Sequence, residues 1–319
     1  MVGVFMWKIL GGIFLGWGLG SNDAANLFGT GVAAQVVKYR TAIVLTSIFV
    51  VVGALMEGHK SMDTVGAMSK MTPMTAFIAT FSAGLCVAVF SFLSLPVSTS
   101  QAIMGAVIGI GMISGIPDFT KLYKVVLCWV LTPVGAAVFS VVLYPAFGKL
   151  FRRVLQDVQA RHIVIKTSLI FAGCYGAYSL GANNVANVTG VYVGSAWLTP
   201  FQANLIGSLS ICLGVLTYSR NVMDTIGKKI VELDGFSAFI ATFSSALTVH
   251  VFTQIGVPVS TSQAIVGSVA GVGIIKSVRT VKKRTLVEIA IGWITTPISS
   301  AILAYVLLRL YMAAAAVCL

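Results

Sequence analysis

The sequence GSNDAAN occupies residues 20–26, and a close copy, GANNVAN, occupies residues 181–187. Both copies lie inside long apolar stretches, at residues 4–37 and 165–195. Polar side chains are costly in hydrocarbon unless they face a cavity, a ligand or another polar group. The repeated motif therefore predicts a polar site that two homologous halves of the chain build together inside a membrane.

Composition supports a membrane protein. Of the 319 residues, 57% are hydrophobic and 9% are charged, against about 25% charged in a typical soluble domain. Apolar stretches of spanning length recur along the chain, so we predict an all-α membrane protein whose residues 1–319 form a single transmembrane domain. The +12 net charge sits in short loops and does not indicate a nucleic-acid partner. The five cysteines lack CxxC or histidine-ligand spacing, so we expect no cofactor.

A second repeated motif gives each half its plan. Residues 95–102 read LPVSTSQA and residues 257–264 read VPVSTSQA, each between two apolar pieces (74–94 and 99–115; 236–256 and 261–275). We predict repeat one at about 4–148, a hydrophilic cytoplasmic connector at 149–166, and repeat two at about 165–310. Each repeat would begin with a helix broken at the GSNDAAN-type motif, because about 34 residues in one straight helix reach roughly 50 Å, whereas the hydrocarbon core is roughly 30 Å thick.

The two apolar pieces around each second motif could span the membrane separately or fold back as a re-entrant helical hairpin. If they are re-entrant, each half crosses three times, so the second half is inverted. With Met1 outside, 15 of the 21 basic residues then lie in cytoplasmic loops, as the positive-inside rule requires. A parallel arrangement would place loops 116–124 and 276–284 on one side, although only the second is strongly basic. The sequence therefore predicts two inverted repeats, each with a broken helix and a re-entrant hairpin, and both termini outside the cytoplasm.

The motifs carry residues suited to an oxyanion. Gly20 and Gly181 permit local unwinding. Asn22 and Asn26 lie four residues apart and share one face of any helix that restarts there, as Asn183 and Asn187 do. Pro96 and Pro258 end the incoming helices, so Ser98–Ser100 and Ser260–Ser262 begin the outgoing ones. A helix start offers free backbone N–H groups, a positive dipole end and hydroxyl donors, which together bind an anion without an arginine.

The paired GxNDxAN-type motifs and the paired PVSTSQA hairpins resemble those of the inorganic phosphate transporter (PiT) family of sodium- or proton-coupled symporters, over residues 4–310. This resemblance implies an importer in the cell membrane that works by alternating access, as a homodimer, with no enzymatic activity. It places phosphate among Asn22, Asp23, Ser98, Thr99, Ser100, Asn183, Asn184, Ser260, Thr261 and Ser262. It implies sodium ligands at Asp23, Asn26, Thr99, Asn187 and Thr261. Asp63 and Asp224, in repeated MDTxG sequences, and Gln101 and Gln263 are candidates for support or gating.

One departure from the family pattern leaves the anion open. The family usually has Asp in both broken-helix motifs, but here Asn184 stands opposite Asp23. A site with one carboxylate fewer favours sulfate, which carries no proton at neutral pH, whereas Asp23 favours phosphate. Sulfate or another tetrahedral oxyanion is therefore the alternative substrate, and an anion channel is a further alternative. A membrane enzyme is disfavoured, because the sequence shows no paired-carboxylate, Ser–His or metal-ligand constellation and no Walker motif.

Overall fold

The computed structural model describes residues 6–66, 71–93, 97–115, 119–154, 157–229, 233–276 and 283–317, and this part of the chain is helical without strands. Its elements are η1 (Met6–Ile9), α1 (Leu10–Asn22), α2 (Ala25–Ala33), α3 (Tyr39–Glu57), α4 (His59–Gly66), α5 (Pro73–Phe92), α6 (Thr99–Ser114), α7 (Phe119–Val154), α8 (Val158–Gly194), α9 (Pro200–Lys229), α10 (Gly235–Gln254), α11 (Thr261–Lys276) and α12 (Lys283–Val317). Within the described ranges, seven helices are long and apolar enough to cross a membrane. The all-α membrane class predicted from the sequence is confirmed.

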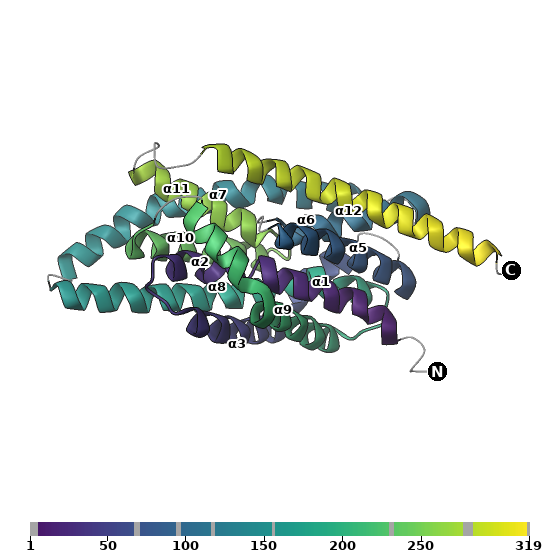
Figure 1. The fold of residues 1–319 in the computed structure, drawn as a ribbon, viewed down its shortest axis with the longest axis horizontal. Coiled ribbons are helices and arrows are strands. Elements are labelled where there is room, and N and C mark those ends of the chain that lie inside the picture. Colours follow the sequence, from purple (N-terminus) through teal and green to yellow (C-terminus); the bar gives the residue numbers. More distant parts are fainter. Residues whose placement is uncertain are drawn as a thin grey trace.

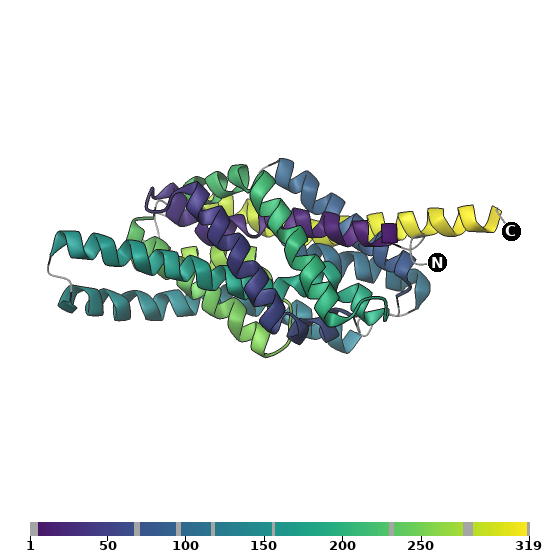
Figure 2. The ribbon, with the colours of Figure 1, turned by 90° about the horizontal axis from the view of Figure 1, so that it is seen from below.

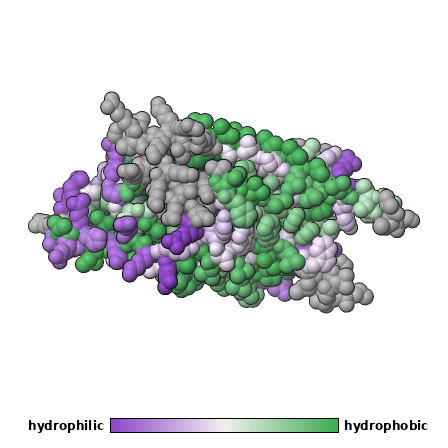
Figure 3. Space-filling model, viewed as in Figure 1, coloured by the Kyte–Doolittle hydropathy of each residue, from purple (hydrophilic) through white to green (hydrophobic). Residues whose placement is uncertain are grey.

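The helices form an elongated bundle with both chain ends at one extremity (Figure 1). At the other extremity α7 and α8 run on as a pair beyond their neighbours (Figure 2). Apolar side chains cover the middle of the face shown in Figure 3, and hydrophilic ones gather mainly at the end where α7 gives way to α8. Because a lipid-facing surface must be apolar, this belt is the region that would contact hydrocarbon.

The two halves of the chain pack reciprocally. Helix α1 lies against α9, and α8, its counterpart in the second half, lies against α3; α6 packs on α12, and α11 packs on α7. Two glycines explain the close approach: a Cβ on Gly20 would lie 1.9 Å from the carbonyl oxygen of Ile211, and one on Gly181 would lie 2.1 Å from that of Val50. Both glycines lie within continuous helix, so they serve close packing and not the predicted unwinding.

The two predicted hairpins are present as α5–α6 and α10–α11. They lie toward opposite ends of the long axis (Figure 1), and their turns meet, since the Ser100 hydroxyl lies 2.9 Å from the carbonyl oxygen of Val259. The second turn leaves α10 through Gly256, whose φ of +75° favours glycine. The equivalent Pro96 lies outside the described residues. Opposed hairpins are what two inverted repeats require, although the inversion across a membrane and the re-entrance of the hairpins stay predictions.

The breaks at the GSNDAAN-type motifs are smaller than predicted. Between α1 and α2, the amides of both Asp23 and Ala24 bond to the Leu19 carbonyl, a locally widened turn in which Asp23 and Ala24 keep helical dihedral angles. In the second half the prediction of a broken helix is wrong, because α8 passes through residues 181–187 without interruption. The polar side chains of this stretch find partners on the hairpins, so the backbone has no need to unwind to satisfy them.

The connector predicted at 149–166 is mostly helix. Helix α7 continues to Val154, and α8 starts at Val158, where the Asp157 carboxylate accepts from the Ala160 amide at 2.7 Å and caps the helix. The polar stretch at residues 59–66 likewise forms the short helix α4. Polar composition in these two segments therefore does not indicate absence of helix.

Candidate functional site

The residues predicted to bind the anion and the cation gather at one place. They lie where the hairpin turns meet the α1–α2 junction and the middle of α8. We call the following twelve residues the central polar cluster; each is at most 2% exposed: Asn22, Asp23, Asn26, Ser98, Thr99, Ser100, Asn183, Asn184, Asn187, Ser260, Thr261 and Ser262. The cluster is therefore closed to solvent on all sides in this conformation.

Asn22 and Asn183 each hold the hairpin of their own half. The Asn22 amide donates to the Ser91 hydroxyl at 3.0 Å, and its carbonyl oxygen accepts from the Val97 backbone at 3.2 Å. In the second half, Asn183 donates to the Thr253 hydroxyl at 3.0 Å and accepts from the Val259 backbone at 2.8 Å. Each side chain thus spans a hairpin from the end of its first helix to its turn. In this conformation the two asparagines fix the hairpins.

The cluster also joins each half to the opposite hairpin. Ser262, on the second hairpin, donates to the Asp23 carboxylate at 2.6 Å and accepts from the Asn26 amide at 2.8 Å. Its counterpart Ser100, on the first hairpin, lies 3.1 Å from the carbonyl oxygen of Asn184 and accepts from the Asn187 amide at 2.8 Å. The same pair of contacts therefore occurs twice, with a carboxylate in one copy and an amide in the other.

The starts of α6 and α11 both face this cluster. Ser98 caps α6 by accepting from the Gln101 amide, and Ser260 caps α11 by accepting from the Gln263 amide, each at 3.2 Å. These two serines are engaged as caps, so the amides and hydroxyls of the next residues are the helix-start donors that a bound anion could meet. Thr99 lies against the Asp23 carboxylate, and Thr261 accepts from the Asn184 amide at 3.2 Å. The Asp23 carboxylate is thus a resident anion beside one helix start.

Several buried oxygens of the site have no hydrogen-bond partner within the described part of the chain. They are the side-chain carbonyl oxygens of Asn26, Asn187, Gln101 and Gln263 and the hydroxyl oxygen of Thr99. An unpaired buried oxygen costs free energy unless something binds it. Amide, hydroxyl and carboxylate oxygens suit a hard cation such as sodium. No group of three His, Cys, Asp or Glu side chains within those ranges suits a transition metal.

Comparison with known proteins agrees with this geometry. The family model described as "Phosphate transporter family" matches residues 19–304. The chain belongs to the phosphate transporter family. A protein of Methanocaldococcus jannaschii that is provisionally named a phosphate permease is 32% identical to this chain, and the match covers 92% of this chain and 93% of that protein. The sulfate permease CysP of Bacillus subtilis is 28% identical, and the match covers 96% of this chain and 88% of CysP. A solved structure titled "The sodium-dependent phosphate transporter" superposes with a TM-score of 0.81 at 25% identity, and the superposition covers 96% of this chain and 99% of that one.

The residues predicted to support or gate this transporter-family site lie in different places. Gln101 and Gln263 lie in the first turns of α6 and α11, next to the cluster. Asp63 is exposed on α4, outside the cluster, and the Asp224 side chain lies outside the described residues. The neighbour of Asp63, Thr64, donates to the Gly256 carbonyl at 2.6 Å and so holds the second hairpin turn. Asp63, Lys124 and Val257 help line a cavity of about 410 Å³ beside that turn, here called the vestibule.

Sequence reasoning missed an ionisable network near this transporter-family site. The His250 ring, on α10, lies 2.6 Å from the Tyr175 hydroxyl and 3.1 Å from the Glu57 carboxylate at the end of α3. Glu57 also accepts from Lys60 at 3.0 Å and from Gln254 at 3.1 Å. Neither Glu57 nor His250 stands in one of the two repeated motifs. Because the two lie 193 residues apart in the chain, no local sequence pattern signals their contact.

Proposed function

We propose that this chain imports inorganic phosphate across the cell membrane by symport with sodium, through alternating access. The observation that carries the proposal is the central polar cluster. It combines two helix starts, several hydroxyl and amide donors and one carboxylate in a fully buried setting. Donors and helix starts suit the oxygens of phosphate, and the Asp23 carboxylate can accept from its protonated oxygen.

Sodium is the coupling ion that fits the unpaired oxygens. Asn26, Asn187 and Thr99 were predicted as sodium ligands from family resemblance, and each has a buried oxygen without a partner among the described residues. Asp23 supplies a negative charge beside Thr99 to balance the cation. A proton on Asp23 would neutralise the carboxylate but would leave the three neutral oxygens without a partner. Sodium is therefore proposed ahead of the proton as the coupled ion, which agrees with the name of the solved structural relative.

Sulfate is the second candidate, and one contact favours it. The Asn184 amide donates a hydrogen bond to the Thr261 hydroxyl, whereas a carboxylate at this position could only accept one. A site with more donors and fewer acceptors is suited to an oxyanion without protons. One relative, from Bacillus subtilis, is named a sulfate permease, so this fold serves that substrate in another protein.

The proposed orientation rests on the loop charges, and the proposed assembly rests on the family resemblance. We place the end with both termini outside and the α7–α8 end in the cytoplasm, because the basic loops require it. The vestibule then opens outward above the second hairpin turn, and its Lys124 would attract an oxyanion. The functional unit we propose is a homodimer, with each chain carrying a complete site.

Flux in proteoliposomes tests the proposal. Purified protein is reconstituted, and uptake of labelled phosphate or labelled sulfate is followed with an inward sodium gradient, an inward proton gradient or neither. We expect phosphate to accumulate above its outside concentration only with sodium. Sodium-driven sulfate accumulation without phosphate uptake would instead establish the second candidate. Flux of either anion that never exceeds equilibrium would show a channel and overturn the symport mechanism.

A further inference from the structure

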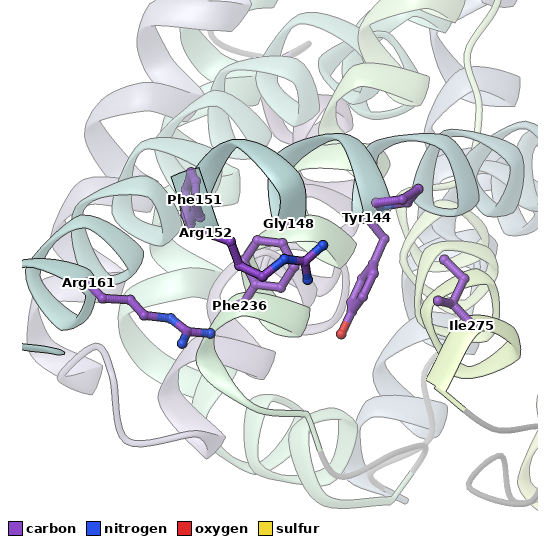
Figure 4. A pocket seen from close by; sticks show the side chains of 8 residues that line it. Tyr144, Gly148, Phe151, Arg152, Arg161, Phe236 and Ile275 are labelled. Carbon is purple, nitrogen blue, oxygen red and sulfur yellow. The ribbon is translucent and has the colours of Figure 1, made fainter. Parts of the chain in front are cut away.

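A separate pocket lies at the α7–α8 end of the molecule, away from the central polar cluster. It has a volume of about 280 Å³ and is formed where the ends of α7 and α11 meet the starts of α8 and α10. Its lining includes Tyr144, Phe151, Arg152, Arg161, Phe236 and Ile275 (Figure 4). This set divides into an aromatic and aliphatic floor and two arginines.

The two arginines carry charge without an acidic partner. Arg152 extends from α7 and Arg161 from α8, and Figure 4 shows the Tyr144 hydroxyl directed to the same open side of α7. Among the described residues, neither guanidinium takes part in an ion pair or donates a hydrogen bond. Within the described part of the chain no carboxylate lines the pocket, and of the acidic residues at the starts of α8 and α10, Asp157 caps α8 and Asp234 is paired with Lys276. The pocket is therefore electropositive.

The floor is built for an apolar body. The Phe236 ring packs edge-on against Tyr144, at 5.1 Å between centroids, and against Phe151, at 5.5 Å. Such a floor offers a free inorganic ion few hydrogen bonds. Basic residues beside apolar surface at the cytoplasmic end of membrane helices match an anionic lipid, whose phosphate meets the arginines while its glycerol and acyl carbons cover the rings.

We propose that this pocket binds the phosphate headgroup of an anionic phospholipid from the cytoplasmic leaflet. The recognised group is a phosphate diester in a headgroup that has no cationic group of its own, held by Arg152 and Arg161. The lipid ties the α7–α8 pair to the start of the second hairpin at Phe236. This site is distinct from the transport site, because no residue of the central polar cluster contributes to it. The proposal rests on the orientation proposed above but not on the identity of the transported anion.

Binding of labelled phosphatidylglycerol to the purified protein in micelles of short-chain phosphatidylcholine tests the proposal. The variants are Arg152→Gln, Arg161→Gln and the double variant, with Arg153→Gln as the matched control, because Arg153 is the next residue on α7, is exposed and does not line the pocket. Since a basic residue near a membrane surface contributes about 1 kcal/mol, or about fivefold in affinity, we expect about fivefold weaker binding for each single variant and about 30-fold for the double variant. Arg153→Gln should bind as the wild type does.

Competition separates the two sources of phosphate. Unlabelled phosphatidylglycerol should displace the label, whereas millimolar inorganic phosphate and phosphatidylcholine should not. Displacement by inorganic phosphate at a concentration that leaves the micelles intact would overturn the lipid assignment. Equal losses in Arg153→Gln and in the pocket variants would show a diffuse charge effect and overturn the site. Unfolding temperatures of all variants, measured in phosphatidylcholine alone, should match, and the single variants keep the test valid if the double variant alone is unstable.

Discussion

Replacing Asp23 with asparagine should abolish sodium-coupled uptake while leaving the fold intact. The second half of the chain already shows that an amide fits this environment. Asn184 occupies the equivalent position and accepts from Ser100 at 3.1 Å, where Asp23 accepts from Ser262 at 2.6 Å. The substitution therefore keeps the hydrogen bond and loses only its charge assistance, at a cost of about 1 kcal/mol. We expect normal expression and an unfolding temperature close to that of the wild type.

The effect on the cation is larger. A carboxylate about 4 Å from a monovalent cation contributes about 4 kcal/mol at an effective dielectric constant of about 20, which corresponds to roughly 1,000-fold in affinity. No neighbouring acid replaces it, since Asp23 is the single carboxylate of the central polar cluster. Sodium binding by Asp23→Asn should therefore weaken by up to roughly 1,000-fold, so that physiological sodium no longer drives accumulation.

The assay is initial phosphate uptake into proteoliposomes as a function of outside sodium, with Asp157→Asn as the control. Asp157 is exposed and caps α8, and asparagine is an equally good N-cap, so this variant removes a carboxylate without touching the site. A sodium half-saturation for Asp23→Asn within a few fold of the wild-type value would refute the reasoning. Such a result would assign the cation to neutral oxygens alone.

Three further predictions concern packing, the ionisable network and pH. Gly20→Ala should lower the unfolding temperature or abolish expression, because the added Cβ would lie 1.9 Å from the carbonyl oxygen of Ile211. The control Gly135→Ala should be neutral or slightly stabilising, because the nearest atom to its added Cβ is 3.8 Å away. His250→Phe should slow phosphate uptake severalfold without changing the sodium half-saturation, because it separates α10 from Glu57 and Tyr175 but spares the cluster; a shifted half-saturation would contradict this role. Burial raises the pKa of Asp234, but hydrogen bonds from Lys276 and Ser237 outweigh it and hold this pKa below its ordinary value. A carboxyl group whose pKa is lower in the folded than in the unfolded protein stabilises the fold at pH values above its unfolded-state pKa, and this stability is lost as the pH falls through its folded-state pKa. The unfolding temperature of the wild type should therefore drop below about pH 4, and that of Asp234→Asn should drop less.

The sequence was sufficient for the class of fold, for the paired helical hairpins and for the grouping of the twelve motif residues in one buried cluster, whose role as a binding site stays a prediction. These features depend on local patterns, namely apolar runs, a proline or glycine turn, and a serine that caps the next helix. It also suggested Asn26, Asn187 and Thr99 as oxygen donors, and these side chains do hold unpaired oxygens within the described part of the chain. Whether they hold sodium stays a prediction.

Long-range contacts explain what the sequence could not provide. The break in α8 was predicted on the assumption that polar residues in a membrane helix must disturb their own backbone. Asn183 instead bonds to Thr253 and Val259, which lie about 70 residues away or more, and the helix stays intact. The network of Glu57, Tyr175 and His250 could not be predicted from the sequence for the same reason, since its members come from three separate helices.

The pattern of hydrogen bonds separates contacts that travel with each hairpin from those that must break. Asn22 and Asn183 bond to the hairpin of their own half, so these bonds survive if a half moves as a body. Ser100 and Ser262 bond across to the opposite half, and any opening of the site must separate them from their partners. The cross-half contacts include Asn26 and Asn187, whose oxygens are among those still unpaired within the described ranges. An anion and a cation bound together at this place would satisfy both halves at once and stabilise the closed form, whereas either ion alone would leave polar groups unmatched. We therefore expect the two ions to be coupled through this arrangement, with Asp23 and Asn184 as the two positions that set its charge balance.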